Sequence, residues 1–143
     1  MHEADDDELA SGFLALLEQH GVDMTVAFRA LTPTAAGDVA ALHALVADAG
    51  AVDTWVQSWR ARLDDEGRTV DEVVATLDHA NPVYVPRNRL VEEALAAAVA
   101  GDLGPAEELL EVITHPFTEQ PDRQRYALPS GPEATRYRTF CGT

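Results

Sequence analysis

The sequence contains no lysine, and all ten basic residues among its 143 are arginine. Several mechanisms depend on a lysine side chain, namely Schiff-base catalysis, phosphate binding by a P-loop and nucleotide binding by the strand lysine of protein kinases. None of these mechanisms can be supplied by residues within this chain.

Cysteine occurs once, as Cys141, third from the last residue. A single cysteine excludes both an intrachain disulfide and a thiol-rich zinc site. Within a flexible Phe-Cys-Gly-Thr terminus the thiol is exposed by default and can reach a partner cysteine or an oxidant. Cys141 is therefore the redox candidate of the chain. The alternative is an incidental cysteine, packed or inert, and the residue taken alone favours that alternative.

No metal-binding pattern is present. The five histidines are scattered, no two of them are four residues apart, and there is no H-E-x-x-H pattern. His20, His79 and His115 each fall at the end of an expected helix, where partial positive charge suits the helix dipole. The acidic run from Asp5 to Glu8 lacks the alternating spacing of a calcium loop, and a solvated helix start explains it better. We predict no metal site in this chain.

The sequence also has no apolar run near the ~20 residues that a membrane helix needs. Its first eight residues are acidic, whereas a secretory signal starts with basic and then apolar residues. These features predict a cytoplasmic protein without a membrane partner. The net charge of −15 argues against nucleic acid as a partner, because phosphate binding needs a basic surface.

No catalytic constellation can be assembled from the residues. Ser11, Ser58 and Ser130 lack the surroundings of a nucleophile elbow, and no glycine-rich phosphate loop occurs. Trp55 and Trp59, four residues apart, are more typical of a core than of a stacking platform in so acidic a chain. We therefore predict no catalytic residue within this chain.

What the sequence does contain is helical periodicity. Apolar residues recur at helical spacing, as in Leu9, Phe13, Leu16 and Leu17, and no strand alternation is visible. The fold class is predicted to be all-α, an irregular bundle of about seven helices, and the length predicts one core. The helices are expected over about residues 7–20, 24–31, 38–50, 53–67, 69–79, 88–101 and 102–115.

Several helix ends and inward side chains can be named. Asp38 and Asp53 are expected to cap helices, and Gly50 and Thr32-Pro33 to end them. Thr69 and Glu72 form a capping-box pattern. The side chains expected to face inward include Met24, Phe28, Leu31, Leu95, Val99, Leu109 and Leu110.

Residues 81–88 interrupt the helices with two prolines. Each proline keeps the preceding residue out of the helical conformation, so the segment is predicted to be a short extended crossing. Asn81, Pro82, Arg87 and Asn88 form its structural motif, with the polar ends tied by side-chain hydrogen bonds. From Pro116 no helical stripe is visible, which predicts a helical domain over 1–115 and an extended, aromatic-anchored tail over 116–143 ending in Cys141.

The ordered string that begins at this crossing resembles the C-terminal region of SelO (YdiU) proteins. Upstream, Phe28-Arg29 and Trp59-Arg60-Ala61-Arg62-Leu63 are similar to the preceding helices of that family. The matching pieces of the string are Asn81-Pro82-x-Tyr84-Val85-x-Arg87-Asn88, Glu92-Glu93-Ala94-Leu95, Gly101-Asp102-Leu103, Leu109-Leu110 and Pro116-Phe117-x-Glu119-Gln120-Pro121.

The resemblance implies a kinase-like protein adenylyltransferase, which transfers AMP from ATP to Ser, Thr or Tyr hydroxyls of proteins with a divalent metal such as Mg²⁺. The nucleotide-binding lysine, metal ligands and catalytic aspartate of the family would lie upstream of Met1. This chain alone is then expected to bind no cofactor and to be inactive, with the missing kinase-like core as its partner. The resemblance also implies a redox role for Cys141, although Cys-Gly-Thr departs from the commoner Cys-Ser-Ser ending.

Two other interpretations stay open. A free-standing acidic helical module for protein interaction would have a self-sufficient core, whereas a region of a larger enzyme would leave apolar surface uncovered. The third interpretation is an independent enzyme, and the lack of a catalytic constellation in the sequence disfavours it.

Overall fold

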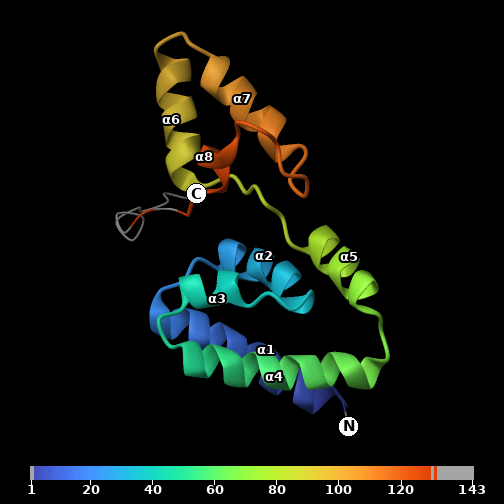
Figure 1. Cartoon of the computed structure of the whole chain (residues 1–143). Coiled ribbons are helices and arrows are strands. Elements are labelled where there is room, and N and C mark those ends of the chain that lie inside the picture. The colour runs from blue at the N-terminus through green and yellow to red at the C-terminus, as the bar shows by residue number, and fades with distance from the viewer. Residues whose placement is uncertain (1, 130, 132–143) are drawn as a thin grey trace. The chain divides into compact units, whose positions relative to one another are not determined.

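The computed structural model describes residues 2–129 and 131, and these form eight α-helices without a strand (Figure 1). The predicted all-α class is confirmed, and one short helix adds to the expected seven. The helices are α1 His2–His20, α2 Met24–Ala35, α3 Ala40–Leu45, α4 Ala49–Glu66, α5 Val70–Ala80, α6 Asn88–Val99, α7 Gly104–Ile113 and α8 Gln124–Ala127.

The chain divides into two compact units, residues 1–81 and 82–143. Each unit has its own cluster of buried hydrophobic residues. The single core expected from the length is therefore wrong, because the helices on either side of Asn81 bury their stripes within their own unit. The expected division into a helical domain over 1–115 and a tail from 116 stays a prediction.

Aromatic rings hold the centre of the first unit. The Phe13 ring stacks on Trp55 with 4.4 Å between centroids and meets Phe28 edge-on at 5.3 Å. Trp55 stacks on Trp59 at 5.4 Å, and its indole Nε1 donates a hydrogen bond to the Leu9 carbonyl at 2.9 Å. Offset stacks and edge contacts of this kind add to the area that large rings bury. The prediction that the two tryptophans belong to a core is confirmed.

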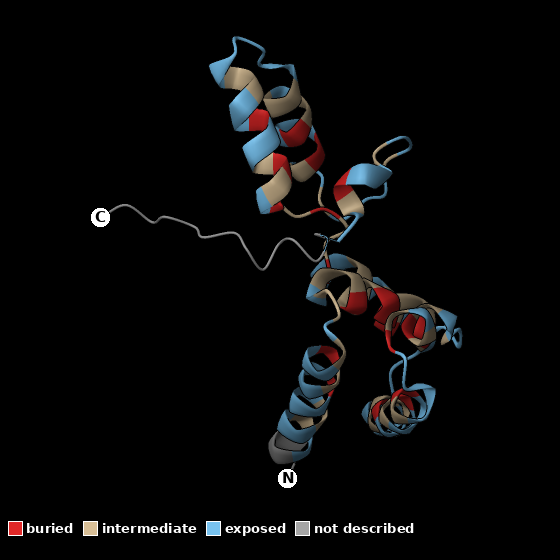
Figure 2. Ribbon diagram, turned by 90° about the vertical axis from the view of Figure 1, so that its left-hand side faces the viewer, coloured by how far each residue is buried: buried red, intermediate tan, exposed pale blue. Residues whose placement is uncertain are grey.

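The second unit is built on the packing of α6 against α7. Leu90 and Ala94 of α6 and Leu109 and Val112 of α7 are buried in one cluster, and Figure 2 shows such buried residues on the facing sides of the two helices. Tyr126 of α8 is buried in the same cluster. Within the described residues 116–129, Tyr126 is thus an aromatic anchor, and Gln124–Ala127 form a turn of helix.

The expected helix boundaries are wrong in three places. Helix α1 begins at His2 rather than near Asp7. Helix α2 continues past Pro33 to Ala35. The turn after Pro33 is stabilised by two hydrogen bonds: the Thr34 hydroxyl donates to the Ala30 carbonyl at 2.8 Å, and Arg60 donates to the Thr34 carbonyl at 2.9 Å. Proline removes one backbone donor, but these side chains compensate at the last turn.

The third boundary error concerns residues 46–50. Val46 is extended and ends α3, and Asp48, not Asp53, caps α4 by accepting a hydrogen bond from the Ala51 amide at 3.0 Å. Gly50 therefore lies in the first turn of α4. Asp53 lies within that helix and contacts His43 at 2.8 Å. Asp38 accepts from the Ala40 amide at 2.9 Å, although the residue before α3 is Val39.

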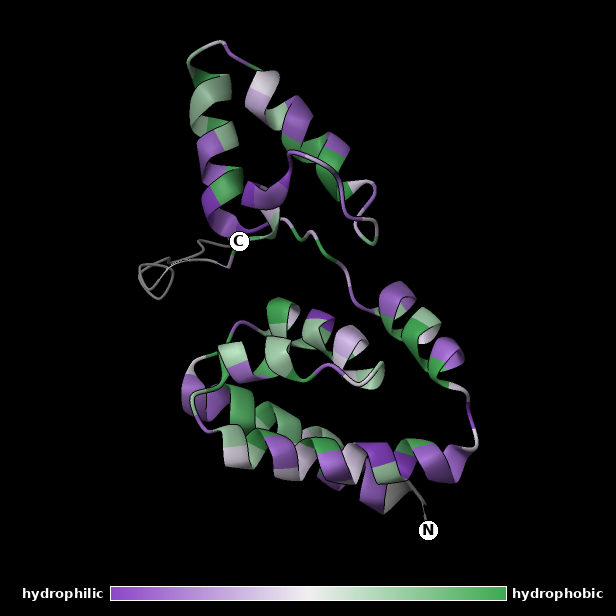
Figure 3. Cartoon of the chain, viewed as in Figure 1, coloured by the Kyte–Doolittle hydropathy of each residue, from purple (hydrophilic) through white to green (hydrophobic). Residues whose placement is uncertain are grey.

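Several apolar side chains expected to be inward are exposed. Met24, Leu95, Val99 and Leu110 are all more than half exposed, and Val99 reaches 91%. Two helices packed against each other cover one side of each helix only, so α6 and α7 keep some hydrophobic residues exposed. Figure 3 shows in green the hydrophobic residues along these helices. Among the described residues no helix is both long and apolar enough to cross a membrane.

The capping box of α5 is confirmed. The Thr69 amide and hydroxyl both donate to Glu72 Oε2, at 2.9 and 3.0 Å, and the Glu72 amide donates to the Thr69 hydroxyl at 3.3 Å. The hydrogen bonds from the Thr69 amide and hydroxyl lower the pKa of Glu72 below its ordinary value of 4.5. A carboxylate whose pKa falls on folding stabilises the fold above its unfolded pKa, and the effect is lost as the pH falls through its folded pKa.

This direction of the pH dependence of stability gives a prediction. The wild-type chain should lose stability relative to Glu72→Gln as the pH falls below 4.5, because only the wild type has a carboxylate to protonate at the cap. Thermal unfolding midpoints of both proteins over that range measure the difference. Glu107→Gln, an equal loss of charge on α7, is the control and should follow the wild-type curve. Parallel wild-type and Glu72→Gln curves would contradict the prediction.

Candidate functional site

The crossing predicted over residues 81–88 is the candidate site, and its first residue closes the first unit. Asn81 follows α5 in an extended conformation, and its amide donates to the Leu77 carbonyl at 2.9 Å. Its side-chain Nδ2 donates to the Phe28 carbonyl of α2 at 3.2 Å. The predicted side-chain tie at this end of the crossing is confirmed for Asn81.

A charged network completes the Asn81 contact. Arg29 Nη1 donates to Asp78 Oδ1 at 3.1 Å and to the Asn81 carbonyl at 3.2 Å. The Thr32 hydroxyl donates to the same Asp78 oxygen at 3.0 Å. The Arg29 guanidinium therefore links the last turn of α5 to α2. It also provides a donor for the Asn81 carbonyl, which lies just after the end of α5.

The rest of the crossing belongs to the second unit. The Val83 and Tyr84 amides both donate to the Pro116 carbonyl, at 2.7 and 3.2 Å. Pro82 precedes this pair and has no amide hydrogen to donate. Arg87 is 7% exposed and extended at the start of α6, and Asn88 is the exposed first residue of that helix. The four predicted motif residues are thus divided between the two units, with Asn81 in one and the other three in the second.

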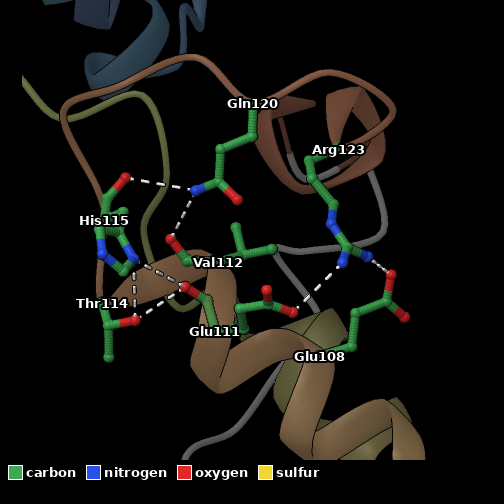
Figure 4. Close-up of polar contacts among 7 residues, drawn as sticks. All are labelled: Glu108, Glu111, Val112, Thr114, His115, Gln120 and Arg123. Atoms are coloured by element: carbon green, nitrogen blue, oxygen red, sulfur yellow. Dashed lines mark hydrogen bonds and ion pairs between the residues drawn. The ribbon is translucent and has the colours of Figure 1, made fainter.

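Tyr84 fixes the segment that follows α7. Its side chain is buried, and its hydroxyl accepts from the Gln120 amide at 2.8 Å and lies 3.4 Å from the Gln120 carbonyl. Gln120 Nε2 also donates to the Val112 and His115 carbonyls at 3.3 and 3.4 Å (Figure 4). The Val112 carbonyl lies in the last turn of α7 and also accepts from the His115 amide at 3.3 Å, so Gln120 gives it a second donor.

Arg123 makes the charged part of the same cluster. Its guanidinium forms ion pairs with Glu108 and Glu111, the latter at 3.3 Å, both from α7 (Figure 4). The Thr114 hydroxyl donates to the Glu111 carbonyl at 2.8 Å. These contacts join α7 to the residues just before α8.

The described side chains do not form a catalytic arrangement. The carboxylates of this cluster face guanidinium groups rather than a nucleophile, and no group of three metal-ligating residues occurs among the described residues. The candidate redox residue, Cys141, lies outside the described residues. The predictions of no catalytic and no metal-binding residue in the chain stay predictions.

Sequence reasoning missed the roles of Tyr84, Gln120 and Arg123. In the sequence Tyr84 stands out only as part of the family string, yet its hydroxyl binds a residue 36 positions away. Gln120 was noted only within a family string. A buried tyrosine usually finds a partner for its hydroxyl, which is the signal that could have suggested such a contact.

The chain was compared with known protein families and with curated proteins. No family model matches the chain. Protein nucleotidyltransferase YdiU of Mycobacterium sp. (strain KMS) is 48% identical over 135 residues, which are 94% of this chain and 26% of the relative. The protein of the same name from Chromobacterium violaceum is 45% identical over 144 residues, 99% of this chain and 30% of the relative. That from Sphingopyxis alaskensis is 41% identical over 139 residues.

Along nearly its whole length, the chain is homologous to proteins of the YdiU family. It spans between a quarter and a third of the length of these YdiU relatives, at 26–30%. The resemblance seen in the sequence is confirmed, and the share agrees with a C-terminal region of a YdiU nucleotidyltransferase.

The Asn81 contacts give a prediction about the stability of the chain. Asn81→Ala should lower the free energy of unfolding by about 1–2 kcal/mol, because it leaves the part-buried Phe28 carbonyl without its donor. Asn88→Ala is the matched control, since Asn88 is exposed and should change stability by less than about 0.5 kcal/mol. Urea unfolding of the two variants measures both, and equal losses would contradict the role of Asn81.

The Tyr84 hydroxyl gives a second prediction. Tyr84→Phe should cost about 1 kcal/mol and speed amide exchange around Gln120, because the Gln120 amide loses its acceptor. Tyr126→Phe is the control, since among the described residues the Tyr126 hydroxyl makes no hydrogen bond although the ring is buried. Hydrogen exchange by mass spectrometry separates the two, and unchanged exchange at Gln120 in Tyr84→Phe would refute the assignment.

Proposed function

We propose that this chain is the C-terminal helical region of a protein adenylyltransferase and contributes structure rather than catalytic groups. In this proposal the whole protein transfers AMP from ATP to Ser, Thr or Tyr hydroxyls of protein substrates. The observation that carries it is the 40–48% identity to proteins named protein nucleotidyltransferase YdiU along nearly the whole chain.

The residue chemistry supports a non-catalytic role for this part. The chain has no lysine to bind phosphates. Glu108 and Glu111 of α7 are paired with Arg123, and the described residues offer no cluster that fits Mg²⁺. ATP and Mg²⁺ are therefore assigned to the kinase-like core in the remainder of the protein, which is the proposed partner of this chain. Cys141 is retained as the candidate redox residue, and a cytoplasmic location stays a prediction.

Exposed apolar residues give further support. A region of a larger enzyme is expected to leave hydrophobic surface uncovered when considered alone. Large apolar side chains are exposed in both units, including Leu14 and Met24 in the first and Leu95, Val99 and Leu110 in the second. The alternative, a free-standing acidic interaction module, is favoured by the separate hydrophobic cluster in each unit.

A domain replacement tests the proposal. We would replace the matching region of the Chromobacterium violaceum relative with this chain, and compare this hybrid with the intact relative, the relative lacking that region, and this chain alone. Incorporation of label into protein is measured with ATP labelled at the α-phosphate and, separately, at the γ-phosphate. Only AMP transfer retains the α label on the substrate.

The intact relative and the hybrid should incorporate the α label, whereas the truncated relative and this chain alone should not. The γ label should remain in solution in every case. Label transfer by this chain alone would refute its non-catalytic role. Transfer of the γ label by the intact relative would refute the reaction, and full activity of the truncated relative would favour the free-standing module.

A further inference from the structure

Helix α1 is the least covered long element of the first unit. It has nineteen residues, but only Phe13 and Leu17 are buried among those whose side chains are described. The helix lies beside α4 (Figure 1). Leu14 of α1 is 46% exposed. A helix with so narrow a buried stripe has capacity to bury more of its apolar side chains.

A cleft of about 280 Å³ runs beside α1 and is bounded by α2 and α4. The Phe13, Phe28, Trp55 and Trp59 rings, which contact one another, form part of its wall. Ala10 and Leu14 line it from the exposed side of α1. Its volume is near the lower limit of ligand pockets, roughly 300 Å³, so it suits an apolar anchor side chain of a partner.

One end of the cleft is acidic. Asp6 of α1 and Glu66 of α4 line it together with Arg62, which contacts Asp6 Oδ1 at 2.6 Å and Glu66 Oε1 at 3.2 Å. Acidic residues therefore outnumber basic ones in the lining at this end. Asp5 and Glu8 of the same helix add further negative charge in an adjoining groove between α1 and α4. A basic side chain on the occupant would complement this end.

The charges argue against a second copy of the chain as the occupant. Although the chain has ten arginines, its net charge is −15, so two copies repel each other at an acidic surface. The relatives supply a different occupant, because 70% or more of their length has no counterpart in this chain. We infer that the cleft between α1, α2 and α4 receives an apolar anchor side chain, flanked by a basic residue, from the remainder of the YdiU protein.

This inference rests on the proposed function, since it requires that the chain act within a larger protein. It assigns a specific face of the chain to that contact. The contact is of the anchor type, in which one or a few apolar side chains in a desolvated pocket provide most of the binding energy and charged residues at the rim orient the partner.

Two matched pairs of variants test it in the hybrid with the Chromobacterium violaceum relative. Ala10→Trp fills the mouth of the cleft, whereas Ser11→Trp places the same side chain on the next, exposed residue of α1, which does not line the cleft. Glu66→Lys reverses the charge at the acidic end, whereas Asp64→Lys makes the same change on α4 outside the cleft.

Amide hydrogen exchange of α1 is measured in the isolated chain and in the hybrid. We expect α1 to exchange about tenfold more slowly in the hybrid, because its opening requires the partner to leave. Ala10→Trp and Glu66→Lys should remove most of this added protection, and Ser11→Trp and Asp64→Lys should keep it. Melting of the isolated variants, expected to agree within each pair, shows that the cleft variants still fold.

The outcomes separate the inference from the proposed function. If α1 exchanges equally fast in the isolated chain and in a hybrid that transfers AMP, the cleft is not covered, and the inference fails while the function stands. If both variants of each pair retain protection, another face makes the contact, and the inference again fails. If the hybrid protects α1 through the cleft but transfers no AMP, the proposed reaction fails and the contact stands.

Discussion

The constraint on which the structure depends is the Asn81-Pro82 step. Proline offers no amide hydrogen and keeps the preceding residue out of the helical conformation, and Asn81 accordingly has φ −109° and ψ 108°. Helix α5 therefore ends there, and the chain separates into two compact units at that bond. The carbonyl and side chain of Asn81 are satisfied by α2 instead, through Arg29 and the Phe28 carbonyl.

Division into two units limits how much surface each can bury. Short chains have a high ratio of surface to volume, and a pair of helices covers only one side of each member. The exposed Val99 of α6 and Leu14 of α1 follow from this limit. The residues matched by this chain are 26–30% of the length of its relatives, and in the proposed function the remainder of the protein covers such side chains. The exposed apolar residues and the homology both support that proposal.

Local signals predicted much of the fold and failed where distant residues decide. The Thr69–Glu72 capping box was readable because all its partners lie within one turn. The continuation of α2 past Pro33 was not, because Arg60, 26 residues away, supports that turn. For the candidate site, the tie at Asn81 was predicted, but its acceptor on Phe28 was not. The Tyr84–Gln120 contact joins residues 36 apart, and no periodicity reports such a pair.

By itself the sequence determined the all-α class, the break at residues 81–88 and the resemblance to the YdiU family. Helical periodicity and proline stereochemistry act over a few residues, and the family string is a property of residue order. Only the tertiary structure decided that two hydrophobic clusters replace one, that Tyr126 is buried, and that aromatic rings of three helices bound a cleft. Those outcomes depend on which apolar helix faces pack together over long separations in the sequence. An apolar stripe indicates a face that tends to be buried, but it does not identify the residues that bury it.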